Sequence, residues 1–570
     1  MFGKIKIREE AEIIGKKHYG YVNVGNDLCG DEVEIAKEIL VFMVVAVNGY
    51  WKLPIGFLPA KSFTASEKAR LLKISLDLLK DANCNVIAIT FDGIASNLNM
   101  MQYLGASVTT PPYKPYFNRK YIMLFDPCHL IKLIRNYFGD HKVFYDNIGR
   151  KIEFKFVQQL HILQKNEGLH LANKLSARHI NFRTQKMKVR LAAQLLSRSV
   201  AIAIDVCEND LHISEFENSS ATVQFLHNVN NIFDIFNSRN LNNLGLKKPL
   251  CPSNKADIFQ NLDELYEYFQ NLRCEDGRFL ISTPKRLGFL GFVNNIIALK
   301  WIYVNYVEKQ DNLKFLPTYK LSQDHLEMFF SAIRSKGGFN NNPSVKNFIP
   351  AYKRLICHTE IKISESANCL ELEKIAVFST STMSSIDKIN TSSNYNTIFN
   401  ELLHSNFSAE NEENDLDDVD VLVDNTTSLS QISMMIVAYI SGNIMKRINK
   451  KIKCDVCVQS CMSSSSKIFH NSLIIKRDYS KKNDGYLTYP SNDVIKLCCS
   501  AERYFRENMK RKRMDETIFA KNVLNVIHNN QHLFNDLKCH AFDQDPLDNH
   551  IYFLMKSIIE LYFDLRLKGE

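Results

Sequence analysis

The stretch "TASEKARLLKISLDLLKDANCNVIAITFDG", residues 64–93, changes its hydrophobic period partway along. Its second half, residues 85–93, is a short apolar, β-branched run that ends in Asp92. Its first half opens with a Thr64–Glu67 capping box, after which apolar residues recur at helical spacing. These apolar residues are Ala69, Leu72, Leu76 and Leu79. The stretch therefore predicts a helix that leads into a buried strand.

Two further runs extend this pattern in both directions along the chain. Residues 38–51, "EILVFMVVAVNGYW", are typical of a buried strand closed by Asn48-Gly49, and residues 120–126, "KYIMLFD", predict another strand that ends in Asp126. Strands that flank a helix in this order indicate a mixed α/β sheet with helices on its faces. In such sheets the chemistry gathers where strands end, so the two aspartates are candidates for a site.

The rest of the chain is predicted to be mostly helical. Residues 126–140 begin with Asp126 as N-cap and Pro127 at the first helical position, and residues 183–206 and 221–240 continue the helical pattern. Residues 376–430 are rich in Ser, Thr and acids and have too little apolar content to fold alone, which predicts a linker. A mostly helical C-terminal domain is expected after it.

Composition limits the class of protein. The chain has 570 residues, 45% of them hydrophobic, which is enough for several domains. No stretch reaches the roughly 18–20 apolar residues of a membrane span, and the N-terminus lacks the apolar core of a signal peptide. The 14 cysteines do not have the spacing of a disulfide framework. We therefore expect a soluble intracellular protein.

Charge points to a polyanionic partner. Lys and Arg number 71 against 62 for Asp and Glu, a net charge of +9. The runs "KRINKKIK" (446–453) and "MKRKR" (509–513) suit phosphate backbones or nuclear import, and solvated helix faces are the alternative. We expect DNA affinity that weakens steeply with salt.

Two carboxylates are the candidate catalytic residues. Asp92 closes a predicted strand, and Glu327 lies in "LSQDHLEMFFSAIRSKGGFNNNP" (321–343), which is predicted to form a helix. Carboxylates from a strand end and a facing helix can hold two Mg²⁺ ions for phosphoryl transfer. An Asp before Gly is more often a turn residue, and an acid on a helix is more often solvated. Spacing alone leaves both interpretations open.

Three motifs carry a family resemblance. "TFDGIASNLNM" (90–100), "FDPCHLIKLIRN" (125–136) and residues 321–343, in this order, resemble the P-element and THAP-domain family of DNA transposases. The resemblance implies an α/β fold with an RNase H-like catalytic domain interrupted by an all-α GTP-binding insertion domain, plus a mostly helical C-terminal domain. The expected boundaries are 1–140 and 316–375 for the catalytic domain, 141–315 for the insertion, 376–430 for the linker and 431–570 for the C-terminal domain.

The resemblance also implies a mechanism. Asp92 and Glu327 would hold Mg²⁺ for cut-and-paste cleavage and transfer of DNA strands, on transposon ends and target DNA, by a homo-oligomer in the nucleus. Asp126 and His129 would shape the neighbouring strand end, unless they only cap the helix. Phe329 and Phe330 would lie on the core side of the helix that carries Glu327.

The resemblance places guanine-nucleotide contacts on eight residues. Lysines meet phosphates, an aromatic ring stacks on the base, and a carboxylate accepts from the N1 and N2 donors of guanine. No GxxxxGK[ST] phosphate loop is present, so we expect GTP as a structural ligand that is not hydrolysed. From the residues alone, an amphipathic basic helix and ordinary core packing explain the same positions. The implied contacts are Lys174, Lys188, Val189, Ser197, Phe233, Asp234, Asn237 and Asp324.

The chain departs from the family at its N-terminus. The family's first catalytic aspartate lies in a strand reading Asp-Glu-Met-x-Ile-Arg, whereas "GKIKIRE" places Gly3 at that position. Glu9 or Glu10 could substitute only if the strand register slipped. We expect an inactive or severely impaired enzyme, either a decayed or domesticated copy or a chain that lacks its true N-terminus and the zinc-binding THAP module. The alternative function is a noncatalytic, domesticated DNA- and GTP-binding protein.

A cysteine cluster opens the C-terminal domain. "KCDVCVQSC" (453–461) contains Cys454-x-x-Cys457, which is half of a tetrahedral zinc site, and His540 and His550 could supply the rest. Structural zinc and unligated thiols both remain open at this point.

Overall fold

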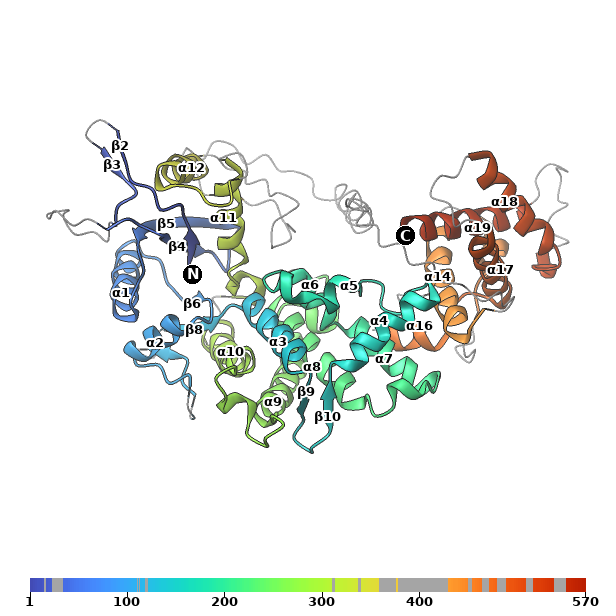
Figure 1. Cartoon of the computed structure of the whole chain (residues 1–570), viewed down its shortest axis with the longest axis horizontal. Helices are drawn as coiled ribbons and strands as arrows, with labels where there is room; N and C mark the ends of the chain where they lie inside the picture. The colour runs from blue at the N-terminus through green and yellow to red at the C-terminus, as the bar shows by residue number, and fades with distance from the viewer. Residues whose placement is uncertain are drawn as a thin grey trace. The chain divides into compact units, whose positions relative to one another are not determined.

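The chain folds into two compact units, shown by the computed structural model (Figure 1). The N-terminal unit comprises Met1–His161, Lys174–Ala201 and Asn218–Thr382, and the C-terminal unit comprises Ile162–Asn173, Ile202–Glu217 and Met383–Glu570. The structure describes residues 1–14, 17–22, 34–109, 111, 113–117, 121–309, 313–336, 340–357, 376–377, 429–449, 454–463, 471–478, 488–508, 516–537 and 550–569.

An antiparallel sheet opens the N-terminal unit. Strand β1 (Phe2–Lys6) pairs with β4 (Glu38–Val45), which pairs with β5 (Trp51–Ala60), and β11 (Ala376–Val377) adds to β5 in parallel. The prediction of one strand over residues 38–51 was wrong at its end, because β4 stops at Val45 and the chain turns into β5. Strand β5 was missed because it contains two prolines and a glycine, which are rare within strands. A short hairpin, β2 (Glu12–Ile14) and β3 (Lys17–Tyr19), follows β1.

A second, partly parallel sheet carries the strand ends of interest. Strand β6 (Ala88–Phe91) runs parallel to β8 (Tyr121–Phe125), with Phe91 opposite Phe125, and β7 (Tyr116–Phe117) pairs antiparallel with β8. Helix α1 (Ala65–Asp81), with the predicted capping box, precedes β6, and α2 (Ala95–Tyr103) follows it; the two helices pack against each other. The predicted helix and strand of residues 64–93 are thus confirmed, as is the predicted strand over residues 120–126. Asp92 and Asp126 leave the sheet at the same edge.

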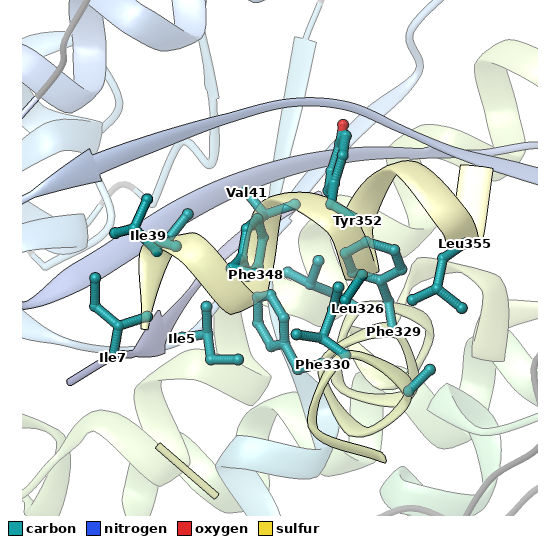
Figure 2. Close-up of a cluster of buried hydrophobic side chains, with 14 of the residues drawn as sticks. Ile5, Ile7, Ile39, Val41, Leu326, Phe329, Phe330, Phe348, Tyr352 and Leu355 are labelled. Carbon is teal, nitrogen blue, oxygen red and sulfur yellow. The ribbon is translucent and has the colours of Figure 1, made fainter. Parts of the chain in front are cut away.

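Two later helices cover the first sheet. Helices α11 (Asp324–Lys336) and α12 (Val345–Cys357) bury their apolar faces against β1 and β4. Figure 2 shows Ile5 and Val41 of the strands meeting Phe329, Phe330 and Phe348 of the helices. Phe329 and Phe330 are fully buried, so their predicted place on the core side is confirmed.

The intervening segment is mainly helical, but not continuously so. The predicted helix over 183–206 is broken into α6 (Val189–Leu195) and α7 (Arg198–Asp205), and a hairpin, β9 (Val143–Tyr145) with β10 (Lys151–Glu153), was not predicted. The remaining helices of this segment are α3 (Pro127–His141), α4 (Lys155–Glu167), α5 (Ala177–Ile180), α8 (Ser220–Phe236), α9 (Lys255–Asn271) and α10 (Leu287–Tyr303).

Helix α10 with its following turn is unusually apolar. Within the described residues, Leu287–Glu308 is the one helix long and apolar enough to cross a membrane. It packs against α3, α9 and β8, and most of its apolar window is buried inside the protein. Its composition is therefore that of a core helix.

The C-terminal unit is a helical bundle around α14 (Gln431–Ile448), α17 (Asn492–Asn508) and α19 (His550–Gly569). Smaller elements flank it: α15 (Asp455–Ser460), α16 (Ser472–Arg477) and α18 (Glu516–Asn529). The predicted linker lies outside the described residues except for β11 and residues 429–430, and so do residues 450–453 and 509–513 of the basic runs.

Candidate catalytic and nucleotide-binding sites

Asp92 is held at the end of β6 by its neighbours. The Asn97 side-chain amide donates to the Asp92 carboxylate at 2.6 Å and to its carbonyl oxygen at 3.0 Å. One strand over, the Asp126 backbone N–H donates to the Phe91 carbonyl at 3.0 Å. The parallel register therefore brings the two aspartates to adjacent positions at one sheet edge.

Glu327 reaches the same edge because the start of α11 is tied to three strands. The Gln323 backbone N–H donates to Asp126 Oδ1 at 3.0 Å, and its side-chain amide donates to the Phe2 carbonyl at 2.6 Å. The Thr90 hydroxyl donates to the Leu321 carbonyl at 2.7 Å. These contacts fix the first turn of α11, where Glu327 lies, beside the ends of β1, β6 and β8.

The electrostatics of Asp92 and Glu327 suit a shared cation. Burial raises the pKa of Asp92, and Lys68, Lys4 and Lys132 lower it in part. Partial burial by surrounding atoms raises the pKa of Glu327, although the residue keeps solvent exposure. Lys132 and Arg334 lower this pKa in part, and the charges of Asp324 and Asp92 raise it. Two partly desolvated carboxylates that repel each other, both hard oxygen donors, fit a divalent cation such as Mg²⁺.

Gly3 lies where the family resemblance places a third carboxylate, and its surroundings are tightly packed. A Cβ built on Gly3 would point at α11, 2.8 Å from Leu326 Cδ2 and 3.4 Å from the Gln323 side-chain nitrogen. Strand β1 is in regular register with β4, with Gly3 opposite Val41, so no slip brings another acid here. Glu9 lies beyond the strand and forms an exposed ion pair with Lys37 at 2.8 Å. Glu10 likewise lies beyond it, 3.7 Å from Arg8.

Asp126 has a structural role. Its buried carboxylate caps α3 by accepting from the His129 backbone N–H at 2.8 Å, while its other oxygen accepts from Gln323. Burial, together with the charge of Asp324, raises the pKa of Asp126 to about 7. Burial lowers the pKa of His129 to about 4. The capping interpretation is confirmed for Asp126, which also joins α3 to α11.

Three residues near the carboxylates were missed from the sequence. Lys68 is fully buried and donates to Ser96 at 2.6 Å and to Asn97 at 2.8 Å, and Asn97 in turn holds Asp92. Lys132, on α3, lowers the pKa of both Asp92 and Glu327. One signal was available for Lys68, because it lies four residues before Leu72 on the apolar face of α1.

The last turn of α8 gathers several predicted nucleotide contacts. Phe233 and Asp234 lie in this turn, and Asn237 is its C-cap. The Asn230 amide donates to Asp234 at 2.9 Å, and its oxygen accepts from the Arg198 backbone N–H at 3.1 Å. Asn230 therefore links the start of α7, directly after Ser197, to Asp234. Burial raises the pKa of Asp234, and Lys247, 3.9 Å away, partly offsets this.

Asp324 joins this cluster through an arginine that the sequence did not indicate. Arg239 donates to Asn237 Oδ1 at 3.1 and 3.3 Å and lies 3.8 Å from Asp324 Oδ2. Its guanidinium stacks over the Tyr319 ring at 5.1 Å. Asp324 is therefore positioned by residues of the helical segment, although it belongs to the same helix as Glu327.

The remaining predicted nucleotide contacts lie on other segments. Lys188 and Val189 begin α6, with Lys188 as its N-cap, and Lys174 precedes α5. Both lysines are exposed.

The predicted zinc ligands are brought together in part. In the C-terminal unit, ligand atoms of Cys454, Cys457 and His550 lie within 4.8 Å of one another. His540 lies outside the described residues.

Four family descriptions match the chain in order. "TNP-like, RNase H N-terminal domain" matches residues 1–105, "TNP-like, GTP-binding insertion domain" matches 128–249, and "TNP-like, RNase H C-terminal domain" matches 319–353. "DNA transposase THAP9, C-terminal domain" matches residues 427–570.

Individual proteins agree with these matches. The chain is 28% identical over 578 residues to the human "DNA transposase THAP9", covering 96% of this chain and 61% of that protein. It is 31% identical over 307 residues to the Drosophila melanogaster "Transposable element P transposase", covering 52% of this chain and 38% of that one. The solved "Drosophila P element transposase strand transfer complex" is similar with a TM-score of 0.51 and 26% identity, covering 62% of this chain and 75% of that chain.

The chain thus spans less than two thirds of the length of these curated relatives. The matches still include both halves of an RNase H domain, the insertion between them and the C-terminal domain. This chain belongs to the family of P-element and THAP9-type transposases.

Proposed function

We propose that this chain binds DNA and guanine nucleotide on a transposase scaffold whose DNA cleavage and strand transfer are severely impaired. The observation that carries the proposal is the geometry at Gly3, whose missing side chain would point at α11 beside Gln323. A carboxylate there would complete a set with Asp92 and Glu327. A two-ion site without one of its three acids should lose most of its rate.

Asp92 and Glu327 are the proposed Mg²⁺ ligands. When bound, the metal would supply Lewis-acid activation of water or of a DNA 3′-hydroxyl for in-line attack on a phosphodiester. The chain's own contribution is orientation, because Asn97 fixes the Asp92 carboxylate and the Gln323 contacts fix the turn that carries Glu327.

The proposed partners are transposon ends and target DNA, bound by a homo-oligomer in the nucleus. Supporting this are the net charge of +9 and the relatives, which are named as transposases, one of them solved in a strand transfer complex. The second candidate function is an active transposase, favoured by the retention of Asp92 and Glu327 in one place.

Restoring the missing acid separates the two functions. The parent chain, Gly3→Asp and Gly3→Asn are compared for Mg²⁺-dependent cleavage of DNA that carries the element ends. We expect the parent and Gly3→Asn to bind this DNA without cutting it. Gly3→Asp should gain cleavage, which a second change, Glu327→Ala, should abolish. Asn is the matched control because it displaces Leu326 in the same way but carries no charge.

Two results would contradict the proposal. Cleavage by the parent chain that Glu327→Ala abolishes would show that the enzyme is not impaired. Failure of Gly3→Asp to cut would show that Gly3 is not the cause of any impairment. Calorimetry of Mn²⁺ binding tests the carboxylate pair without relying on activity. The parent should bind Mn²⁺, and Asp92→Asn should weaken this binding.

Nucleotide binding has its own test. GTP should raise the melting temperature of the full chain, whereas ATP, which lacks the guanine N1 and N2 donors, should not. Asp324→Ala and Phe233→Ala should abolish the shift, and Asp257→Ala, at an exposed acid on α9, should keep it. GTP should be recovered unhydrolysed. The absence of any shift in the parent protein would refute this part of the proposal.

A further inference from the structure

We infer that Cys454, Cys457 and His550 form a structural zinc site in the C-terminal unit. The Cys457 sulfur lies 3.7 Å from His550 Nδ1, and the ligand atoms of the three residues all lie within 4.8 Å of one another. Bond lengths of about 2.3 Å to sulfur and about 2.0–2.1 Å to nitrogen place the atoms of a tetrahedral site about 3.5–3.8 Å apart. The cluster is therefore already close to the size that zinc requires.

The local sequence explains why the two thiols converge. Cys454 is the N-cap of α15, and Cys457 is three residues later, within its first turn. Residues three apart lie on one face of a helix, so both sulfurs point the same way. Neither cysteine is in a disulfide.

The third ligand comes from a distant part of the chain. His550 is the first residue of α19 and is separated from Cys457 by 93 positions. Two thiolates and an imidazole are a donor set that suits zinc and is unsuited to Mg²⁺ or Ca²⁺, which prefer oxygen. A tetrahedral site has one more position, which a water molecule can fill.

Such a site would fasten α15 to the bundle. Helix α15 has six residues, too few to be stable alone, and its segment is also held by contacts to α19 and by backbone hydrogen bonds to the approach to α17. The Ser491 N–H donates to the Cys461 carbonyl at 2.8 Å, and the Ser463 N–H donates to the Tyr489 carbonyl at 3.0 Å. Zinc would add metal–ligand bonds to the existing contact between this segment and α19, so the metal stabilises the fold and has no part in cleavage.

The test uses the full chain, purified without a polyhistidine tag or chelator. We expect about one zinc per chain by elemental analysis, and Co²⁺ exchanged for zinc should show a thiolate-to-metal charge-transfer band. Cys457→Ser and His550→Ala should each lower metal affinity at least about tenfold, and Cys454→His, which keeps a ligand, should retain binding. Cys357→Ser, at an exposed thiol of the N-terminal unit, is the control and should bind as the parent does.

Absence of zinc from the parent, together with failure of added Co²⁺ to give the thiolate band, would overturn the site. So would unchanged metal content in both Cys457→Ser and His550→Ala. The Co²⁺ spectrum of the parent keeps the test decisive even if a variant fails to fold.

Discussion

Lys68 shows how a buried charge supports the carboxylate site. Its ammonium is enclosed within the N-terminal unit and donates to Ser96 and Asn97, and Asn97 orients Asp92. Burial, with a smaller contribution from Lys4, lowers the pKa of Lys68 to about 8, and Asp92 partly offsets this. Lys68 is a positioning residue that acts on Asp92 through Asn97.

This pKa predicts a pH dependence of stability. The folded state binds fewer protons at Lys68 than the unfolded state between pH of about 8 and 10.5. Stability from this group should therefore rise with pH across that window, with a slope approaching about 1.4 kcal/mol per pH unit. Below pH of about 8 the full cost of burying the charge remains.

The measurement compares urea unfolding of the parent and Lys68→Met between pH 7.5 and 9.5. The difference between the free energies of unfolding, parent minus Lys68→Met, should increase as pH rises. Lys73→Met, at an exposed lysine of the same helix, should show no such divergence. Parallel profiles for the parent and Lys68→Met would contradict the prediction.

The candidate catalytic residues were found from short motifs, whereas their supporting residues were not. Asp92 and Glu327 lie in idiosyncratic stretches, so they could be named from the sequence. Arg239 and Asn230 could not be singled out from the sequence, because each also contacts a distant helix: Arg239 lies near Asp324 on α11, and Asn230 accepts from Arg198 on α7. Their roles depend on tertiary contacts that no hydrophobic period encodes.

At the scale of elements, α3 owes its close packing to Gly139. A Cβ built on Gly139 would lie 2.1 Å from the Phe182 ring, which is itself buried against Phe154 and Arg135. We expect Gly139→Ala to lower the free energy of unfolding by about 1–3 kcal/mol or more, because the ring has little room to retreat. Urea unfolding measures this.

Gly56→Ala is the matched control, because a Cβ built there meets nothing within 4 Å. It should change stability by about 0.5 kcal/mol or less. Equal losses in the two variants would show that chain flexibility, and not the approach to Phe182, explains the glycine in α3.

Elements with strong periodicity were predicted well, and those without it were not. Helix α1 has a capping box and apolar residues at helical spacing, and strands β6 and β8 are short apolar runs. Strand β5 was hidden by Pro54, Gly56 and Pro59, and the break between α6 and α7 has no glycine or proline to mark it. That break is stabilised by tertiary contacts, including the bond from the Arg198 N–H to Asn230.

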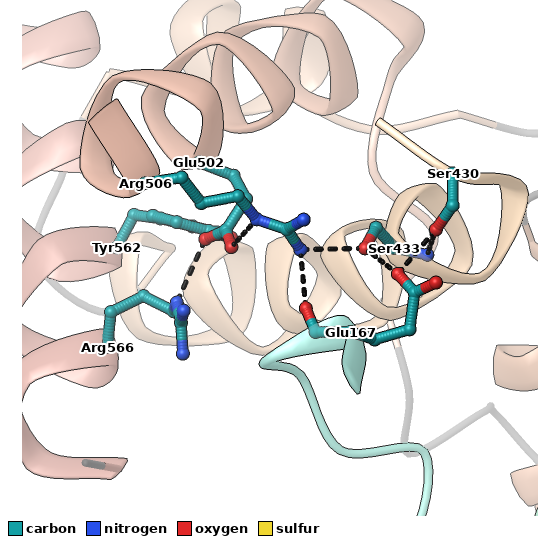
Figure 3. A network of polar contacts seen from close by, with 7 residues as sticks. All are labelled: Glu167, Ser430, Ser433, Glu502, Arg506, Tyr562 and Arg566. Carbon is teal, nitrogen blue, oxygen red and sulfur yellow. Dashed lines mark hydrogen bonds and ion pairs between the residues drawn. The ribbon is translucent and has the colours of Figure 1, made fainter. Parts of the chain in front are cut away.

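At the scale of the whole molecule, a buried ion network integrates the C-terminal unit (Figure 3). Glu502 is fully buried and accepts from Arg506 at 2.8 Å, Arg566 at 2.9 Å and the Tyr562 hydroxyl at 2.8 Å. Arg506 also donates to the Glu167 carbonyl at 2.9 Å, across 339 positions of sequence. The network thus connects helices α17 and α19 to a segment of the predicted insertion.

Glu502→Gln should be strongly destabilising. The change removes the charge that two guanidinium groups share and puts an amide N–H₂ against a donor, which should cost about 3–5 kcal/mol. The expected result is a lower urea midpoint for the unfolding of the C-terminal unit, which limited proteolysis can detect. Glu560→Gln, on the same bundle and in an exposed pair with Lys556, should cost under about 1 kcal/mol. Similar losses for both would show that the network is dispensable.

The division of the chain between the two units could not be predicted. The boundaries expected from the family place residues 141–315 in one domain, whereas Ile162–Asn173 and Ile202–Glu217 pack within the C-terminal unit. Composition changes little across these short segments, and their partners are hundreds of residues away. Sequence patterns report local preference, so such interleaving becomes visible only in three dimensions.

The core shared by β1, β4, α11 and α12 also has a consequence for biosynthesis. Ile5 and Val41 are synthesised long before Phe330 and Phe348. At a synthesis rate of about 5–20 residues per second, the two strands remain without the helices that bury them for on the order of tens of seconds. A nascent chain in that interval presents an apolar sheet face that chaperones must shield. Transcripts that end before residue 324 would encode polypeptides prone to aggregate, whatever activity the finished protein retains.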